Sequence, residues 1–201
     1  MSVDYRLFPE HKHPAHVNDV IAAYTWLLST GIKPGNVVVG GDSAGGLLTM
    51  RLITRLRDEK KPLPAAAFCL SPWLDLTYSG NSFYDNMPTD VMFGTDGSFA
   101  MLYQLFKAFD PDLDLAAPDV SPLFASMDGL PPLLVQATTA EELLDDSRRL
   151  VEKARAAGVD AELQTWPGMC HVFQAIGFNY GWPEVAQALD SLTAFIKKHL
   201  A

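Results

Sequence analysis

The chain has few cysteines and no long apolar run. Its 201 residues include two cysteines, Cys69 in an apolar stretch and Cys170 near a Pro-Gly pair. Two isolated cysteines make neither a disulfide framework nor zinc-ligand spacing, which favours a reducing compartment. No stretch approaches the ~20 apolar residues of a membrane span, and no charged-then-apolar leader precedes Val3. We therefore expect a cytoplasmic protein without a membrane span.

Basic charge is also scarce. The chain has 15 Lys and Arg against 24 Asp and Glu, a formal net charge of -9. Nucleic acids and anionic membranes bind basic patches, and here the basic clusters are short pairs such as Lys60-Lys61 and Lys197-Lys198. We therefore expect no nucleic-acid partner, while small neutral molecules remain open. Hydrophobic residues make up 48% of the chain, enough for the core of one domain of this length.

Apolar patterns of strand and helix type alternate along the chain. Val3 to Leu7 alternates like the end of a strand, and a helix pattern runs from near Pro14 to Gly31. Short strands are expected at 37–39, 65–70, 133–137 and 161–166, and those at 65–70 and 133–137 are of the apolar type that lies buried in a parallel sheet. Helices are expected after residue 44, at 143–156 and from Pro183. This alternation predicts an α/β fold whose mostly parallel sheet is flanked by helices.

A long irregular insert interrupts this alternation. From Asp75 to about Pro131 the segment is rich in aromatics, Met, Asp, Gly and Pro, with one helix expected around 99–109. So long an insert in a compact α/β chain is usually a lid or a substrate-binding element. We therefore expect one domain over residues 1–201 that carries a cap at about 75–131.

Three aspartates within this insert resemble the start of a calcium loop. Asp110, Asp112 and Asp114 have the right spacing. Leu115, however, stands where that loop needs glycine, and Ser121 stands where it needs glutamate. We expect no metal there and no cofactor elsewhere.

The most informative stretch is Gly41-Asp42-Ser43-Ala44-Gly45, which lies between a β-branched run and a helical pattern. It matches G-x-S-x-G, the nucleophile-elbow pattern, in which a strained backbone projects the serine hydroxyl above a sheet. Glycines at 41 and 45 would let strand and helix approach closely. The N–H of Ala44, at the helix start, would stabilise negative charge beside Ser43. The alternative is a structural turn that happens to contain serine.

A serine nucleophile needs a histidine base. Four of the five histidines are poor candidates: His11, His13 and His16 precede the serine, and His199 lies beside lysines at the end of the chain. His171 follows the last strand pattern, where strand ends deliver catalytic groups. Its neighbour Cys170 is a weaker nucleophile candidate, because adjacent side chains in an extended loop usually diverge.

The histidine in turn needs a carboxylate. Glu141, Glu142, Asp145 and Asp146 all follow the strand pattern at 133–137. We choose Glu141, because the two aspartates are placed to fill the first turn of a helix, where carboxylates suit the helix dipole. The order Ser43, Glu141, His171 is the order expected of an α/β hydrolase.

Sequence blocks along nearly the whole chain support this interpretation. They are Asp4-Tyr5-Arg6-Leu7, Gly41 to Gly46, Leu70-Ser71-Pro72-Trp73, Gly129-Leu130-Pro131-Pro132, Leu143 to Ser147 and His171-Val172-Phe173. With these blocks the chain resembles the hormone-sensitive-lipase-like family of α/β-hydrolase esterases. The resemblance implies hydrolysis of short- to medium-chain carboxylic esters by Ser43, His171 and Glu141. Trp73, Phe93, Met169 and Phe173 are expected to contact the substrate.

The chain departs from that family at its front. The family carries a His-Gly-Gly-Gly segment that supplies oxyanion-binding N–H groups, and this sequence has none. The resemblance therefore implies that N-terminal strands are missing and that a central strand position beside residues 37–40 is empty. We expect either self-association as a homo-oligomer or completion by an N-terminal segment. The alternative to a serine esterase is a catalytically impaired hydrolase-like fragment or a small-molecule-binding protein.

Overall fold

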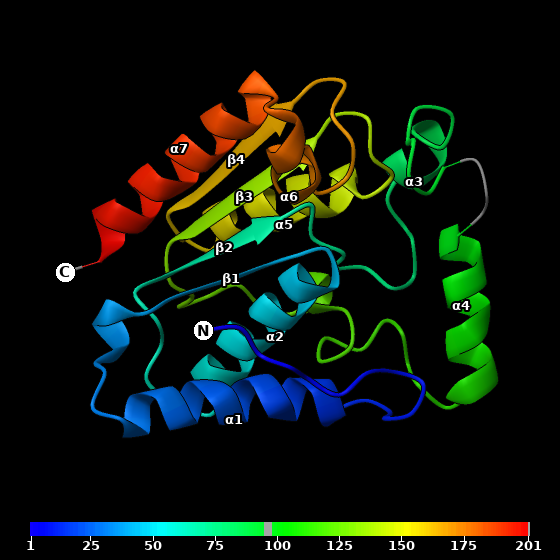
Figure 1. Ribbon diagram of the computed structural model, residues 1–201. Helices are drawn as coiled ribbons and strands as arrows, with labels where there is room; N and C mark the ends of the chain where they lie inside the picture. The colour runs from blue at the N-terminus through cyan, green and yellow to red at the C-terminus, as the bar shows by residue number, and fades with distance from the viewer. Residues whose placement is uncertain (95–97, 201) are drawn as a thin grey trace.

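The computed structural model describes residues 1–94 and 98–200, which form a parallel sheet with helices on both faces (Figure 1). The sheet has four strands, in the order β1-β2-β3-β4. They are β1 (Val38–Asp42), β2 (Ala66–Leu70), β3 (Leu133–Thr138) and β4 (Ala161–Trp166). All three pairings are parallel, so each connection crosses over the sheet. The predicted α/β alternation is confirmed.

The two faces of the sheet are covered by different helices. The long helices are α1 (Ala15–Ser29), α2 (Ala44–Asp58), α5 (Leu144–Ala156) and α7 (Pro183–His199). On β3, Leu133 and Val135 pack into the core with Leu150 of α5, whereas Gln136 donates to the carbonyl of Ala188 in α7 at 2.9 Å. Successive strand residues point to opposite faces, so α5 and α7 cover opposite faces. Figure 1 shows α1 and α2 on the side away from α7.

Glycine and proline end or begin these helices where the sequence predicts. Pro14 is the N-cap of α1, and Pro183 is the first residue of α7. Gly31 and Gly158 follow α1 and α5 with φ of 94° and 76°, a conformation that glycine adopts without strain. The strand at 161–166 has the predicted bounds, and the helix at 143–156 begins one residue later than predicted.

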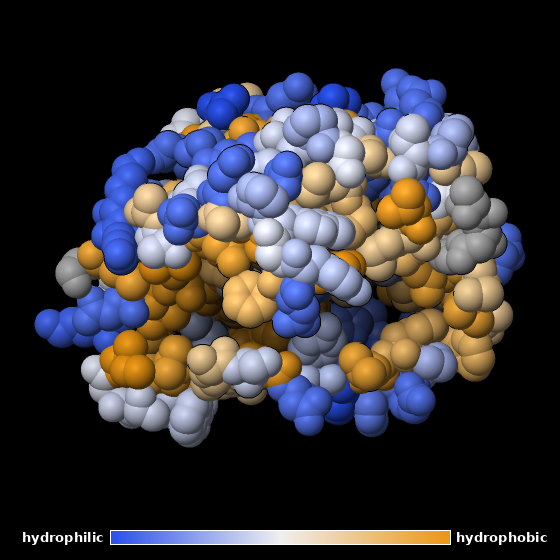
Figure 2. All heavy atoms as spheres, turned by 45° about the horizontal axis from the view of Figure 1, so that its top comes forward, coloured by the Kyte–Doolittle hydropathy of each residue, from blue (hydrophilic) through white to orange (hydrophobic). Residues whose placement is uncertain are grey.

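The expected strand at Val3 to Leu7 is wrong. These residues belong to no strand, and Arg6 is instead tied to α1 by Asp19, with Nη2 2.7 Å from Oδ1. A hollow of about 530 Å³ separates Met1 to Val3 from β1 and α1. Figure 2 shows hydrophobic residues around the hollowed part of the molecular surface. Without a neighbouring strand at ladder distance, an alternating pattern does not form a strand.

The insert between β2 and β3 is mostly irregular. It contains α3 (Ser82–Asp85), α4 (Ser98–Phe109) and a short 3₁₀ helix, Pro122–Phe124. The helix expected at 99–109 is confirmed. Shorter elements elsewhere are the 3₁₀ helices Pro34–Asn36 and Gly177–Tyr180 and the helix α6 (Phe173–Ile176). Within the two described ranges, none of the helices combines the length and apolarity needed to cross a membrane.

Candidate active site

Ser43 lies in a strained turn between β1 and α2. β1 ends at Asp42, α2 begins at Ala44, and Ser43 has φ 51° and ψ -117°. A positive φ is unfavourable for a non-glycine residue and persists only where the surroundings impose it. Here the N–H of Ser43 donates to the carbonyl of Leu70 at 2.9 Å, and the carbonyl of Ser43 accepts from Trp73 at 3.2 Å. The turn therefore has the backbone geometry predicted for a nucleophile elbow.

Glycines permit this turn, but not quite as the sequence suggested. A Cβ at Gly41 would lie 2.5 Å from the carbonyl carbon of Gly45, so Gly41 is required. A Cβ at Gly45 would meet only the Asp42 carboxylate, at 4.0 Å. The second crowded position is Gly46, where a Cβ would lie 2.6 Å from the Cβ of Pro72. The G-x-S-x-G motif therefore predicts Gly41 correctly, but it does not show that the second position without room for a Cβ is Gly46 rather than Gly45.

The N-terminus of α2 points donors at the turn. Ala44 is the first helical residue, so no carbonyl within α2 accepts its N–H. The helix dipole adds partial positive charge at this end. Ala44 is exposed and borders a hollow of about 180 Å³. An anionic oxygen bound there would be stabilised by this N–H.

His171 and Glu141 form a buried pair. His171 Nδ1 lies 2.7 Å from Glu141 Oε2, and the two side chains are 3% and 0% exposed. The other carboxylate oxygen, Oε1, accepts the N–H of Thr138 at 3.2 Å. Glu141 is thereby fixed from two sides, and it holds one particular nitrogen of the imidazole.

The other three carboxylates considered from the sequence have different roles. Asp145 accepts the N–H of Ser82 at 3.0 Å, and Asp146 accepts the N–H groups of Leu74 and Asp75 at 2.6 and 2.9 Å. Both aspartates therefore tie the start of the insert to α5. Glu142 is buried beside the insert, where its N–H donates to Asp90 at 2.9 Å. Only Glu141, among these four described residues, is hydrogen-bonded to His171.

The second imidazole nitrogen, Nε2, is buried and has no hydrogen-bond partner among the described residues. No hydrogen bond joins it to Ser43 Oγ, although both residues are described. Ser71 connects their surroundings: it directly follows Leu70, which accepts from Ser43, and its Oγ accepts the N–H of Val172 at 3.2 Å. The structure thus brings Glu141 and His171 into contact at the ends of β3 and β4, and places Ser43 at the end of β1, on the other side of β2.

Two residues of the insert bind residues 139–142, the loop after β3 that carries Glu141 and is called the acid loop below. The sequence did not reveal these two residues. Asn86 Nδ2 donates to the carbonyls of Glu141 and Thr139 at 2.8 and 3.1 Å. Asp90 is 3% exposed, and its second oxygen accepts the N–H groups of Met92 and Phe93 at 2.9 and 3.2 Å. Neither residue has a local pattern that would reveal a partner about 50 positions away.

The residues expected to contact substrate differ in position. Trp73 borders the 180 Å³ hollow together with Ala44. The ring of Phe93 meets that of His171 edge to face, with centroids 5.1 Å apart. The carbonyl of Met169 accepts from Thr138 Oγ1 at 2.7 Å, and this bond ties the loop that carries His171 to the end of β3. Phe173 has no exposed surface and packs under α7 in the structure, so its position is that of a core residue.

The thiol considered from the sequence is Cys170. Burial raises the pKa of the Cys170 thiol, which disfavours the thiolate that a cysteine nucleophile requires. Among the residues that the structure describes, no three His, Cys, Asp or Glu side chains are grouped as metal ligands.

Known proteins similar to this chain are esterases. A family model described as alpha/beta hydrolase fold matches residues 1–175. An esterase of Acinetobacter venetianus is 38% identical over 193 residues, which is 96% of this chain and 62% of the relative. An acetyl-hydrolase of Streptomyces hygroscopicus is 38% identical over 197 residues, 98% of this chain and 64% of the relative.

Solved structures similar to this chain are also esterases. A crystal structure of an esterase from the bacterial hormone-sensitive lipase family has a TM-score of 0.90 and 43% identity, covering 98% of this chain and 65% of that one. The esterase EstE5, in crystals soaked with p-nitrophenyl butyrate, has a TM-score of 0.88 and 40% identity over 98% of this chain and 64% of its own. The chain thus spans less than two thirds of the length of these relatives.

Proposed function

The chain belongs to the α/β-hydrolase family, and from that premise we propose that it is a serine esterase acting on short- to medium-chain carboxylic esters. The names of its relatives, esterase and acetyl-hydrolase, support the class of reaction. The observation that carries the proposal within this chain is the buried 2.7 Å contact between Glu141 and His171 beside a strained serine turn. A histidine oriented in this way by a carboxylate is what a serine needs to become a nucleophile.

In the first half of the reaction Ser43 Oγ attacks the ester carbonyl carbon, and its proton passes to His171 Nε2. Glu141 keeps Nδ1 protonated and stabilises the imidazolium that forms. The carbonyl oxygen becomes an oxyanion, which the N–H of Ala44 binds. When the intermediate collapses, the alcohol leaves with the proton from His171, and an acyl group remains on Ser43.

The second half reverses these roles. His171 takes a proton from a water molecule, whose oxygen attacks the acyl carbon, and a second tetrahedral intermediate forms. Its collapse breaks the bond to Ser43 Oγ, which regains its proton from His171. Trp73 and Phe93 present apolar surface to the ester. The insert is proposed to be the cap over the site, because Asn86 and Asp90 attach it directly to the acid loop.

Hydrolysis of p-nitrophenyl butyrate tests the proposal. The chain is expected to release p-nitrophenol, and His171→Ala is expected to lose turnover by orders of magnitude while its circular dichroism is unchanged. Cys170→Ser is the matched control, because it changes the adjacent residue and leaves the proposed chemistry intact. If His171→Ala and Cys170→Ser have the same turnover, the proposed base is wrong.

The alternative is a hydrolase-like protein that binds a small molecule without turning it over. The observation in its favour is the absence of a hydrogen bond between Ser43 and the unpartnered His171 Nε2 in the described structure. Catalytic hydrogen bonds are often long or absent without substrate, so this geometry does not exclude catalysis. Butyrate-ester binding without release of p-nitrophenol by the folded chain would favour the alternative.

A further inference from the structure

Two hollows meet at one side chain of α2. The first, of about 180 Å³, begins at Ala44 and is bordered mainly by apolar side chains, among them Leu47, Leu48, Trp73, Leu76 and Phe106. The second, of about 230 Å³, is bordered by residues that include Pro14, Thr54, Arg55, Asp58 and Asp119. His13 and Arg51 border both hollows. These two residues therefore form the partition between them.

The partition is held in place from both sides. Arg51 is 4% exposed, and its Nη1 lies 2.8 Å from His16 Nε2. Its Nη2 donates to the carbonyl of Val120, in the insert. His13 is fixed by Asp119, with Nε2 and Oδ2 3.3 Å apart. A guanidinium tied to two acceptors on different elements is not free to swing aside.

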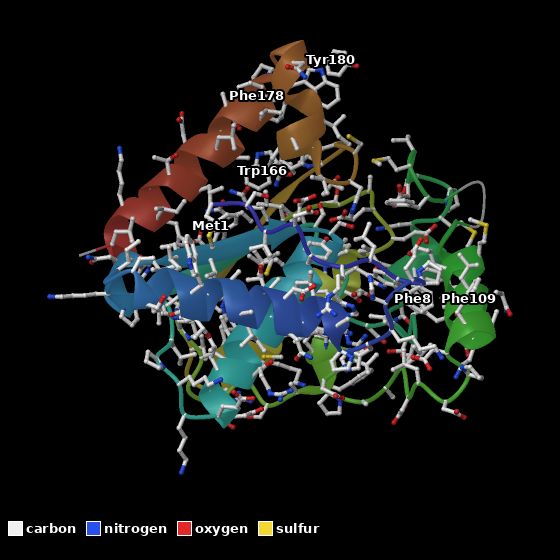
Figure 3. The ribbon with its side chains drawn as sticks, turned by 60° about the horizontal axis from the view of Figure 1, so that its bottom comes forward. Met1, Phe8, Phe109, Trp166, Phe178 and Tyr180 are labelled. Atoms are coloured by element: carbon white, nitrogen blue, oxygen red, sulfur yellow. The ribbon has the colours of Figure 1, made fainter. Side chains whose placement is uncertain are left out.

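The first hollow leads to this partition from Ala44, the residue after the proposed nucleophile, and Ala44 also borders the 530 Å³ hollow in which Ser43 lies. Ala44, Leu48 and Arg51 are spaced by four and three residues, so they lie on one face of α2, about 10 Å from first to last. Long helical side chains lean toward the helix N-terminus, so the stem of Arg51 leans toward Ala44. Phe8 closes another side: its ring lies 4.9 Å from that of Phe106, and Figure 3 shows Phe8 beside Phe109.

The charge at this position is unfavourable for stability. Among the described residues no carboxylate lies within salt-bridge distance of Arg51. Burial lowers its pKa to about 9, so at neutral pH the side chain stays charged. A buried charge without an ionic partner destabilises a fold, and departures of this kind are expected chiefly at functional sites. A role in substrate selection would explain why such a residue is present.

We infer that Arg51, with His13, closes the far end of the acyl-binding pocket and sets an upper limit to the length of the acyl chain. The inference rests on the proposed esterase function and assigns the first hollow to the acyl group. A short chain fits between Ala44 and the partition. A longer chain would have to displace the guanidinium from His16 and Val120. An acyl chain has no hydrogen-bond donor, so these two acceptors would be left without a partner. Removing the side chain would join the two hollows into one longer channel.

A series of p-nitrophenyl esters from acetate to decanoate tests this inference. The measured quantity is the ratio of kcat/KM for decanoate to that for butyrate, in which any loss common to both substrates cancels. Arg51→Ala is expected to raise this ratio by about tenfold or more, since a few methylene groups in an apolar pocket change kcat/KM by at least that factor. His13→Ala is expected to raise it less, because Arg51 still stands.

Arg55→Ala is the matched control. Arg55 lies four residues further along α2, borders only the second of these two hollows, and its loss changes the net charge equally. Its ratio is expected to equal that of the unmodified chain. An unchanged ratio in folded Arg51→Ala, or an equal rise in Arg55→Ala, overturns the inference.

A second variant keeps the inference testable if Arg51→Ala does not fold. Leu48→Phe adds bulk between Ala44 and Arg51, so it is expected to lower kcat/KM for butyrate relative to acetate. An unchanged ratio there also overturns the assignment of this hollow to the acyl chain. If the unmodified chain hydrolyses none of the esters, it is the proposed function that fails. If it hydrolyses butyrate and the variants leave both ratios unchanged, the proposed function stands, and both the assignment of this hollow to the acyl chain and the role of Arg51 fail.

Discussion

At the scale of single residues, the site depends on which carboxylate holds the imidazole. Glu141→Ala removes the partner of His171 Nδ1 and is expected to lower esterase turnover by about 10⁴, the loss typical of a triad acid. Asp145→Ala removes a bond to Ser82 and a first-turn charge, and is expected mainly to lower the free energy of unfolding, by about 1 kcal/mol. Turnover and chemical denaturation of both variants check this. Equal losses of turnover in the two folded proteins would contradict it.

Because Asp146 is buried, we expect the free energy of unfolding to depend on pH. Burial raises its pKa to about 7, although the N–H groups of Leu74 and Asp75 favour the charged form. The folded chain therefore binds a proton that the unfolded chain releases near pH 3.8. The stabilisation from this proton is fully present below that pH and is lost as the pH rises to about 7, by up to about 4 kcal/mol.

Asp146→Asn isolates this effect, because the amide is neutral at every pH and its oxygen can still accept one of the two N–H groups. The difference in the free energy of unfolding, variant minus unmodified chain, is expected to grow in favour of the variant between pH 4 and 7. Urea denaturation across that range measures it. Parallel pH curves for the two proteins would show that Asp146 does not titrate in this way.

At the scale of elements, the turn between β1 and α2 tolerates no side chain at Gly41. Gly41→Ala would bring its Cβ to 2.5 Å from the backbone of Gly45, and relief requires α2 to shift. We expect a loss of about 1–3 kcal/mol in the free energy of unfolding together with a fall in turnover. Gly35→Ala is the control, because a Cβ there meets nothing within 4 Å. Comparable stability of the two variants would contradict the close contact.

Most elements were predictable because local chemistry marks them. Periodicity predicted the helices at 143–156 and 99–109 nearly to the residue. Gly31 and Gly158 marked the ends of α1 and α5, and Pro183 marked the start of α7. The prediction of a strand at Val3 to Leu7 was wrong, because a strand requires a neighbouring strand to pair with, and the alternating pattern does not reveal whether one is present. Element order placed Glu141 and His171 at adjacent strand ends.

Contacts between distant segments were not predictable. The bonds from Asn86 and Asp90 to the acid loop join residues more than 50 positions apart. The partition at Arg51 depends on His16, which lies in α1, and on the carbonyl of Val120, which lies in the insert. Such contacts are fixed by tertiary packing, and no motif records them.

At the scale of the whole molecule, the unpaired edge of β1 is the part of the described sheet that we expect to associate with another chain. β1 pairs only with β2 among the described strands, and consecutive residues 37–42 border the 530 Å³ hollow. Unpaired strand groups beside apolar side chains favour association with another chain. We propose that the protein self-associates through this edge, or binds an N-terminal segment there.

Light scattering coupled to size-exclusion chromatography checks this proposal. The chain is expected to form dimers or larger species as its concentration rises, and Val38→Asp, at the edge, is expected to weaken that association. Ile32→Asp is the control, because Ile32 is 41% exposed and does not border the hollow. A monomer at every concentration, or an equal effect of the two substitutions, would contradict association through β1.

The central claim is that Ser43 is the nucleophile. The most direct measurement is to treat the chain with a fluorophosphonate, which reacts with activated serines, and to locate the adduct by peptide mass spectrometry. We predict one adduct per chain, on Ser43, and its loss in His171→Ala. An adduct on another residue, or ester hydrolysis that continues undiminished in Ser43→Ala, would contradict the account.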